Sequence, residues 1–321
     1  MNLINVATAR LIGAFLALGS MFGAAIASPF LVGDIFASTG SGNIQIYSKT
    51  GIFRETLNTG SGGFTTGSAF DSAGNLYVTN FSFNTVSKFA GPGDPHTRTT
   101  FGSGYSSPES IVFLANGHVL VGNTGGGIGI REFDATGTFI RTVLNGQVDW
   151  FDVGADQDTI LYTQEQNQVR KASISGGAAQ ATSVFANVGD FALRILRDGT
   201  VLVAANANVA HLSSTGALLN SYDVAGVDQF FALNLDPDGT SFLSGSFQNG
   251  NVYRFNISGG PSTQTISTGC GSSCLFGVSI FGEITAALPP PPTGTVPEPG
   301  TVMLVASALC GLWLARRRRH I

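Results

Sequence analysis

The chain has 321 residues, of which only 11% are charged, whereas 43 are glycine and 24 are phenylalanine. This composition excludes a helical bundle and favours an all-β fold in which many short strands are joined by tight turns. Residues 28–284 carry 11 basic and 19 acidic side chains, a net charge of about −8, so we expect no nucleic-acid partner, which would need a clustered basic face.

Residues 1–27 have the pattern of a signal peptide. Arg10 supplies a positive charge, residues 11–22 form an apolar run, and Ala25-Ile26-Ala27 gives the small-x-small sequence at which such peptides are cleaved. The alternative is a buried N-terminal helix, but the apolar run is followed at once by Ser28-Pro29. We therefore expect an exported protein whose mature chain begins near Ser28.

Residues 28–284 contain a repeat that is visible in the turns. Segments such as GSAFDSAGNLYVTN and ALRILRDGTVLVAAN each place a turn rich in Asp, Asn and Gly between two apolar runs, which is the pattern of a β-hairpin. Successive turn centres lie 43, 40, 42, 40 and 43 residues apart. These centres are Gly74, Gly117, Gln157, Gly199, Gly239 and Gly282.

A second family of turns alternates with the first, in segments such as FDATGTFIRT and LSSTGALLNS. Two hairpin turns in each repeat of about 41 residues imply four strands, and such a unit recurring six times predicts a six-bladed β-propeller. The segment FLVGDIFAS at the start matches a second strand, and Phe276–Phe281 at the end matches a first strand. We expect both ends to share one blade, because closure pairs sheet edges that an open solenoid would expose; a two-sheet sandwich is the other alternative.

The hairpins DSAGNLYVTN and LRDGTVLVAAN, each followed by a strand and a TG turn, resemble those of NHL-like and SMP-30/gluconolactonase-like six-bladed propellers. The resemblance covers roughly residues 30–284. It implies a propeller fold and leaves the function open, because propellers include both enzymes and binding modules.

Oxygen-bearing side chains recur where innermost strands are expected to begin and second strands to end. In an antiparallel blade these two positions share one face, so we expect the side chains to meet at the mouth of the central channel. The candidates are Asp34, Asn80, Glu109, Asn123, Asp149, Asp190, Asn206 and Asp228.

This set has three interpretations. The side chains could make local turn hydrogen bonds, could hold Ca²⁺ or another divalent cation or contact a glycan without catalysis, or could form a catalytic metal site. The resemblance to gluconolactonases implies the third, in which a metal polarises a lactone carbonyl. No nucleophile and base pair is evident, so no catalytic residue is assigned.

Cys270 and Cys274, in CGSSC, are close enough to form a small disulfide loop in an oxidising compartment. The spacing has three intervening residues, not the two of a CxxC redox motif, and a zinc site would need two further ligands. We expect a structural disulfide.

The composition changes after the repeats. Residues 285–295 form a proline-rich linker, residues 301–315 are apolar, and Arg316, Arg317, Arg318 and Arg319 follow. The apolar run is shorter than the roughly 20 residues of a membrane-spanning helix. A permanent single-pass anchor is one interpretation of residues 296–321.

The order of Val296, Pro297, Glu298 and Pro299, a short apolar helix and an arginine cluster closely resembles the PEP-CTERM sorting signal of Gram-negative bacteria. The resemblance implies transient residence in the inner membrane, processing by an exosortase, and delivery to the periplasm, outer surface or extracellular matrix, in association with exopolysaccharide or biofilm. Exopolysaccharide and surface proteins are the partners that it suggests.

From the sequence we expect a non-enzymatic binding or structural propeller at the cell surface. The alternative is a metal-dependent, gluconolactonase-like hydrolase that uses the acidic ring.

Overall fold

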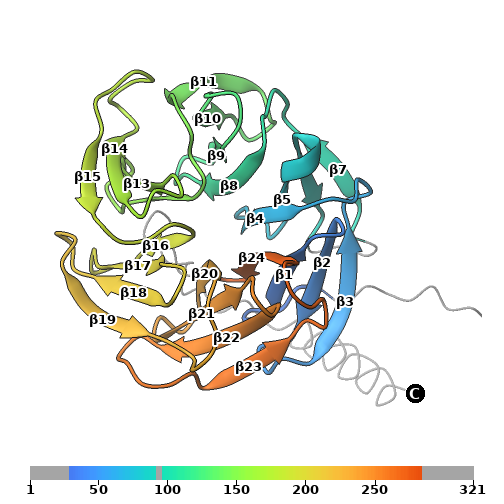
Figure 1. Ribbon diagram of the computed structural model, residues 1–321. Coiled ribbons are helices and arrows are strands. Elements are labelled where there is room, and N and C mark those ends of the chain that lie inside the picture. Colours follow the sequence, from blue (N-terminus) through green and yellow to red (C-terminus); the bar gives the residue numbers. More distant parts are fainter. Residues whose placement is uncertain (1–28, 92–95, 284–321) are drawn as a thin grey trace, which may run out of the picture.

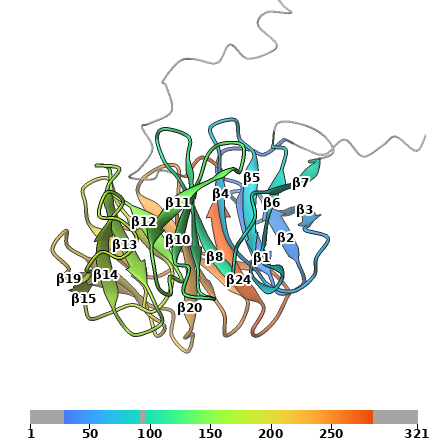
Figure 2. The ribbon, with the colours of Figure 1, turned by 90° about the horizontal axis from the view of Figure 1, so that it is seen from above.

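The computed structural model describes residues 29–91 and 96–283, which form a ring of six four-stranded antiparallel sheets (Figure 1). The prediction of an all-β, six-bladed propeller is confirmed. Seen edge-on, the ring is a thick disc with connecting loops on both faces (Figure 2). The predicted signal peptide, the proline-rich linker and the sorting signal lie outside the described residues.

The strands of each blade succeed one another from the ring axis outward (Figure 1). Blade 1 consists of β24 (Leu275–Ile280), β1 (Ile35–Thr39), β2 (Asn43–Tyr47) and β3 (Phe53–Asn58). Blade 2 consists of β4 (Thr65–Phe70), β5 (Leu76–Asn80), β6 (Thr85–Phe89) and β7 (Arg98–Phe101), with the short 3₁₀ helix η1 (Phe81–Phe83) after β5. Blade 3 consists of β8 (Pro108–Phe113), β9 (Val119–Asn123), β10 (Ile130–Phe133) and β11 (Phe139–Leu144).

The other three blades follow the same order. Blade 4 consists of β12 (Phe151–Val153), β13 (Thr159–Thr163), β14 (Val169–Ser173) and β15 (Ser183–Ala186). Blade 5 consists of β16 (Leu193–Ile195), β17 (Val201–Ala204), β18 (Val209–Leu212) and β19 (Leu218–Tyr222). Blade 6 consists of β20 (Phe230–Leu235), β21 (Ser241–Ser246), β22 (Asn251–Asn256) and β23 (Gln264–Ser267).

Blade 1 closes the ring with strands from both ends of the chain, as expected. β24 pairs with β1 in an antiparallel ladder that places Ile35 opposite Ile280 and Ala37 opposite Val278. In Figure 1 the orange-red β24 lies beside the blue β1. This ladder removes the two unpaired sheet edges that an open array would present.

The hydrophobic core is divided into clusters, one between each pair of neighbouring blades. Successive side chains of a strand point to opposite faces, so each blade contributes to two clusters. On β5, Leu76 and Val78 pack toward blade 1, whereas Tyr77 packs toward blade 3. This explains why the two inner strands of each blade are buried at nearly every position, as in β8 and β9, since both of their faces are covered. The outermost strands, such as β3 and β15, are largely exposed.

The hairpin turns follow the predicted chemistry. At the first turn of the repeat in blade 2, the Asp71 Oδ1 atom accepts hydrogen bonds from the backbone N–H groups of Ala73 and Asn75, and Gly74 adopts a φ of +81°. An aspartate of this kind replaces a backbone acceptor in the turn, and glycine takes a left-handed conformation without steric cost.

Within the described residues, no helix is long and apolar enough to cross a membrane.

A buried ion pair joins three blades. Arg194 of β16 donates from Nε to Glu283 Oε1 at 2.8 Å, and both side chains are at most 10% exposed. Glu283 follows β24, and its Oε1 also accepts the backbone N–H of Leu235 in β20. The ion pair therefore links the end of blade 1 to blades 5 and 6.

We expect Arg194→Leu to lower the free energy of unfolding by about 3–5 kcal/mol, because it leaves Glu283 buried without its partner. Urea unfolding followed by circular dichroism measures the loss. Arg197→Leu is the matched control, since Arg197 lies in the adjacent turn and is exposed. Equal stability of the two variants would contradict a structural role for the ion pair.

Candidate functional site

The innermost strands begin, and the second strands end, on one face of the ring, which we call the mouth face. The ladders show this directly, because Thr65 lies opposite Asn80, Pro108 opposite Asn123, and Phe230 opposite Ser246. The expected convergence of these two strand ends is therefore correct for these blades. The side chains at the two positions take several different roles.

Three predicted carboxylates do come together. Glu109 is the second residue of β8 and is 5% exposed, Asp149 precedes β12 and is 1% exposed, and Asp190 precedes β16. Asp149 lies within electrostatic range of both Glu109 and Asp190. Glu165, which follows β13 and is not one of the predicted residues, joins them. These four residues, Glu109, Asp149, Glu165 and Asp190, are called the acidic wall.

Burial makes three carboxyl groups of the acidic wall, those of Glu109, Asp149 and Glu165, hard to ionise. Burial raises the pKa of Glu109 well above its usual range, and the charges on Asp149 and Glu165 raise it further. Burial also raises the pKa of Asp149 to about 7, opposed by a hydrogen bond from Gln147 Nε2 to Asp149 Oδ1 at 2.9 Å. The other oxygen, Asp149 Oδ2, is buried without a hydrogen-bond partner. Partial burial and Asp190 together raise the pKa of Glu165.

The indole of Trp150 lies beside the acidic wall. Its Nε1–H is close enough to Glu109 to lower the pKa of that carboxyl, an effect smaller than the opposing effect of burial. The same N–H makes no hydrogen bond of normal geometry. The Glu109 carboxylate therefore lacks a well-formed hydrogen bond within the described residues.

The predicted asparagines mainly support their own blades. Asn80 Nδ2 donates to Thr85 Oγ1 at 2.8 Å and to Ser87 Oγ at 3.0 Å. Asn123 Nδ2 donates to the carbonyl of Gly129 at 2.9 Å, and its Oδ1 accepts the backbone N–H of Ser106 at 3.0 Å. These bonds fit the interpretation as local strand-end contacts.

Two further predicted residues lie at the mouth face but contribute differently. Asp228 is exposed in the connection before β20, and Asn206, which follows β17, is exposed and has a φ of +61°. Only Asn206 lines the cavity described below.

Asp34 is a correction to the expected set. Asp34 precedes the first residue of β1, whereas the prediction placed it at the end of that strand. The next residue, Ile35, pairs with Ile280, which is the last residue of the innermost strand β24. Asp34 therefore lies toward the opposite face of the ring. Its Oδ2 atom pairs with Arg54 and accepts the backbone N–H of Leu31, so its role is local.

The geometry of the mouth bears on the metal interpretation. Within residues 29–91 and 96–283, no three or more His, Cys, Asp or Glu side chains lie together in a way that could hold a metal ion. The carboxylates of the acidic wall are of the type that Ca²⁺ prefers, but Asn80 and Asn123 direct their amide groups into their own blades. A calcium site at this mouth stays a prediction.

A cavity of about 360 Å³ lies at the mouth face, within the usual range for small-molecule sites. Phenylalanine rings line most of it, and we call them the phenylalanine wall: Phe64, Phe81, Phe191, Phe231, Phe247 and Phe276. Glu109 and Glu165 line it from blades 3 and 4. One cavity therefore has an apolar wall and a carboxylate-bearing wall.

The rings of the phenylalanine wall contact one another. Phe64 stacks on Phe276 with ring centroids 4.3 Å apart, and Phe276 lies 5.2 Å from Phe247. Phe231 lies 5.9 Å from Phe247 and 4.6 Å from Phe191. Ring pairs at such distances attract one another, so these contacts favour the arrangement that makes the apolar surface.

The cavity is built from equivalent positions in the repeat. Near the start of the innermost strand, successive blades present Thr66, Glu109, Phe191, Phe231 and Phe276. After the second strand, they present Phe81, Glu165, Asn206 and Phe247. Phenylalanine recurs at these positions of the repeat. This recurrence points to the cavity, but a search for oxygen-bearing side chains does not detect it.

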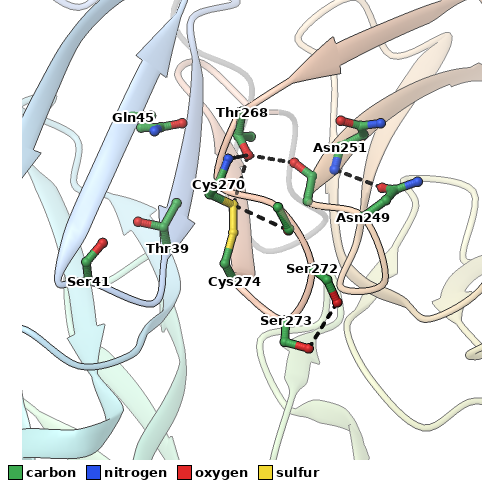
Figure 3. Close-up of a disulfide and its surroundings, with 12 residues drawn as sticks. Thr39, Ser41, Gln45, Asn249, Asn251, Thr268, Cys270, Ser272, Ser273 and Cys274 are labelled. Carbon is green, nitrogen blue, oxygen red and sulfur yellow. Dashed lines mark hydrogen bonds between the residues drawn. A yellow bond between two sulfur atoms is a disulfide. The ribbon is translucent and has the colours of Figure 1, made fainter.

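Cys270 and Cys274 are joined in a disulfide that closes the loop before β24 (Figure 3). The Cys274 carbonyl accepts the backbone N–H of Gly40 at 2.9 Å, and Ser273 N–H donates to the Phe247 carbonyl at 2.7 Å. Because Phe276 is two residues beyond Cys274, this loop holds two parts of the phenylalanine wall in register.

The comparisons with known proteins concern the fold. A chain in the crystal structure of a nidogen/laminin complex is similar with a TM-score of 0.64 and 15% identity, over 77% of this chain and 98% of that chain. A virginiamycin B lyase from Staphylococcus aureus has a TM-score of 0.47 and 10% identity, over 63% of this chain and 69% of that chain. No protein-family model matches the sequence, and no curated protein matches it.

We expect stability to fall as the pH rises toward about 7, because the folded chain holds a proton on Asp149 that the unfolded chain releases near its ordinary pKa of 3.8. Between these two values this group alone contributes a slope of about 1.4 kcal/mol per pH unit. Asp149→Asn should flatten the dependence, as measured by urea unfolding between pH 5 and 8.

Asp228→Asn is the control for this experiment, since Asp228 is an exposed acid at the same mouth. It should retain the wild-type slope. If Asp149→Asn and Asp228→Asn give the same pH dependence as the unsubstituted chain, Asp149 is not held protonated by burial.

Proposed function

We propose that this chain is an exported binding propeller whose mouth cavity holds a small ligand. The single observation that carries the proposal is the preformed cavity, in which rings from blades 1, 2, 5 and 6 meet carboxylates from blades 3 and 4. A concave, largely apolar site with a few polar groups is the usual form of a small-molecule site. The propeller fold is compatible with a binding or structural scaffold.

The location of the protein is the second part of the proposal. The signal-peptide pattern of residues 1–27 and the PEP-CTERM-like segment 296–321 support export across the inner membrane and sorting by an exosortase in a Gram-negative bacterium. The binding module would then work at the outer surface or in the extracellular matrix, with exopolysaccharide or surface proteins as partners. The disulfide between Cys270 and Cys274 suits an oxidising compartment.

The sorting proposal predicts a processed C-terminus. Mass spectrometry of the protein exported by a host with an exosortase should find a chain that ends near Pro297-Glu298-Pro299 and lacks the arginine cluster. Glu298→Ala should retain that cluster, whereas Thr293→Ala in the linker should be processed normally. Recovery of intact Arg316–Arg319 on the exported wild-type protein would contradict sorting by cleavage.

The binding proposal predicts that the mouth cavity accepts an organic ligand. A panel of small amines, carboxylic acids, lactones, disaccharides and Ca²⁺ is added to the purified chain, and the melting temperature and the fluorescence of Trp150 are followed. Trp150 packs against Phe231 with ring centroids 6.0 Å apart, so its emission reports on the cavity. At least one organic compound should raise the melting temperature, because binding to the folded state stabilises it.

Phe64→Ala should abolish that shift, while Phe53→Ala should not, since Phe53 is exposed on the outermost strand of blade 1. If no organic compound binds in the millimolar range, the binding proposal fails. Turnover of a lactone that requires Ca²⁺ and is lost in Asp149→Asn would instead favour the gluconolactonase-like hydrolase.

A further inference from the structure

The two walls of the mouth cavity differ in chemistry. The phenylalanine wall offers ring faces and edges, whereas Glu109 and Glu165 offer carboxylates on the other side. No lysine, arginine or histidine is among the described residues that line the cavity. The ionisable side chains among these lining residues are therefore both acids.

This arrangement selects among ligand classes. An anion would find no positively charged side chain in the lining and would be repelled by either glutamate in its ionised form, so acids are disfavoured. A sugar needs many hydrogen bonds, and polar lining groups other than the two glutamates are few: Thr66, Asn206 and Gln229. An uncharged apolar molecule would cover the buried Glu109 carboxylate without giving it a partner, which costs free energy.

A cation with an apolar body satisfies both walls at once. Its charge would pair with Glu109, which is 5% exposed and lines the cavity. Burial raises the pKa of Glu109 in the empty cavity, and a bound cation would favour its ionised form, so binding would release a proton. Its body would displace water from the rings, and a nearby ring face also attracts a cation. The buried and unpartnered Asp149 Oδ2 adds negative charge behind Glu109.

We propose that the mouth cavity binds a small organic ammonium ion, a protonated amine attached to an aromatic or aliphatic body, with the ammonium group at Glu109 and Glu165 and the body on the phenylalanine wall. The proposal rests on the proposed function, because it assumes that the cavity is a ligand site. It specifies the chemical class of that ligand.

The test compares four probes that separate charge from apolar body. Phenethylammonium has both, 2-phenylethanol has the body alone, 3-phenylpropanoate has the body with the opposite charge, and protonated ethanolamine has the charge on a small polar body. Isothermal titration calorimetry is done with the purified full-length chain at pH 8, because a higher pH favours the ionised form of the buried acids. Phenethylammonium should bind at least tenfold more tightly than each of the others.

Two variants assign the binding to the two walls. The double substitution Glu109→Gln and Glu165→Gln should weaken phenethylammonium at least tenfold and leave 2-phenylethanol unchanged, because it removes charge and keeps shape. Phe64→Ala should weaken both, and since Phe64 is 42% exposed, the fold should tolerate the change. Asp228→Asn, which removes an exposed acid outside the cavity lining, is the charge control.

The outcomes separate this inference from the proposed function. If 2-phenylethanol or protonated ethanolamine binds as tightly as phenethylammonium, or if the glutamine variant binds phenethylammonium normally, the ammonium assignment is overturned while the cavity remains a ligand site. If phenethylammonium does not bind but another organic compound does so in a way that Phe64→Ala abolishes, the assignment again fails alone. If no organic compound binds, both proposals fail.

Discussion

The antiparallel ladder between β24 and β1 joins residues that are more than 230 positions apart, and the other blade interfaces depend on it. Each sheet buries both faces, so a blade without a neighbour on one side would expose half of its apolar side chains. Closing the ring gives blade 1 its innermost strand and blade 6 its second neighbour. The same strand places Phe276 in the lining of the mouth cavity, so the strand that closes the ring also contributes to the cavity.

The repeat period made the fold predictable from sequence, whereas the site was only partly predictable. Turns need Asp, Asn and Gly at fixed places, so their spacing revealed blade number and strand number without any knowledge of packing. The position of Glu109 and Asp149 at the mouth followed from the same reasoning. The prediction for Asp34 was wrong because it assumed a strand that ends at this acid in FLVGDIFAS, whereas the strand begins at Ile35.

The phenylalanine wall was not predicted, because composition alone does not reveal it. Phenylalanine also fills the blade interfaces of this chain, as Phe36 and Phe133 do, and composition does not distinguish the two uses. Glu165 was not predicted, because it lies in a loop beyond β13, where an acid is ordinarily solvated. Only the three-dimensional positions show that it faces the same cavity as Glu109.

Burying carboxylates at the mouth opposes stability, and the rest of the molecule has to offset that cost. A carboxylate removed from water without a cationic partner is raised in free energy, which is why the pKa of Asp149 is shifted to about 7. Elsewhere in the propeller a buried acid does have a cationic partner, because Glu283 is paired with Arg194. Residues with strongly shifted pKa values in a cavity are frequent at functional sites, although structural networks also produce them. In this chain the shifted acids lie beside a preformed apolar surface, and that combination, more than either feature alone, supports the mouth as the working site of the propeller.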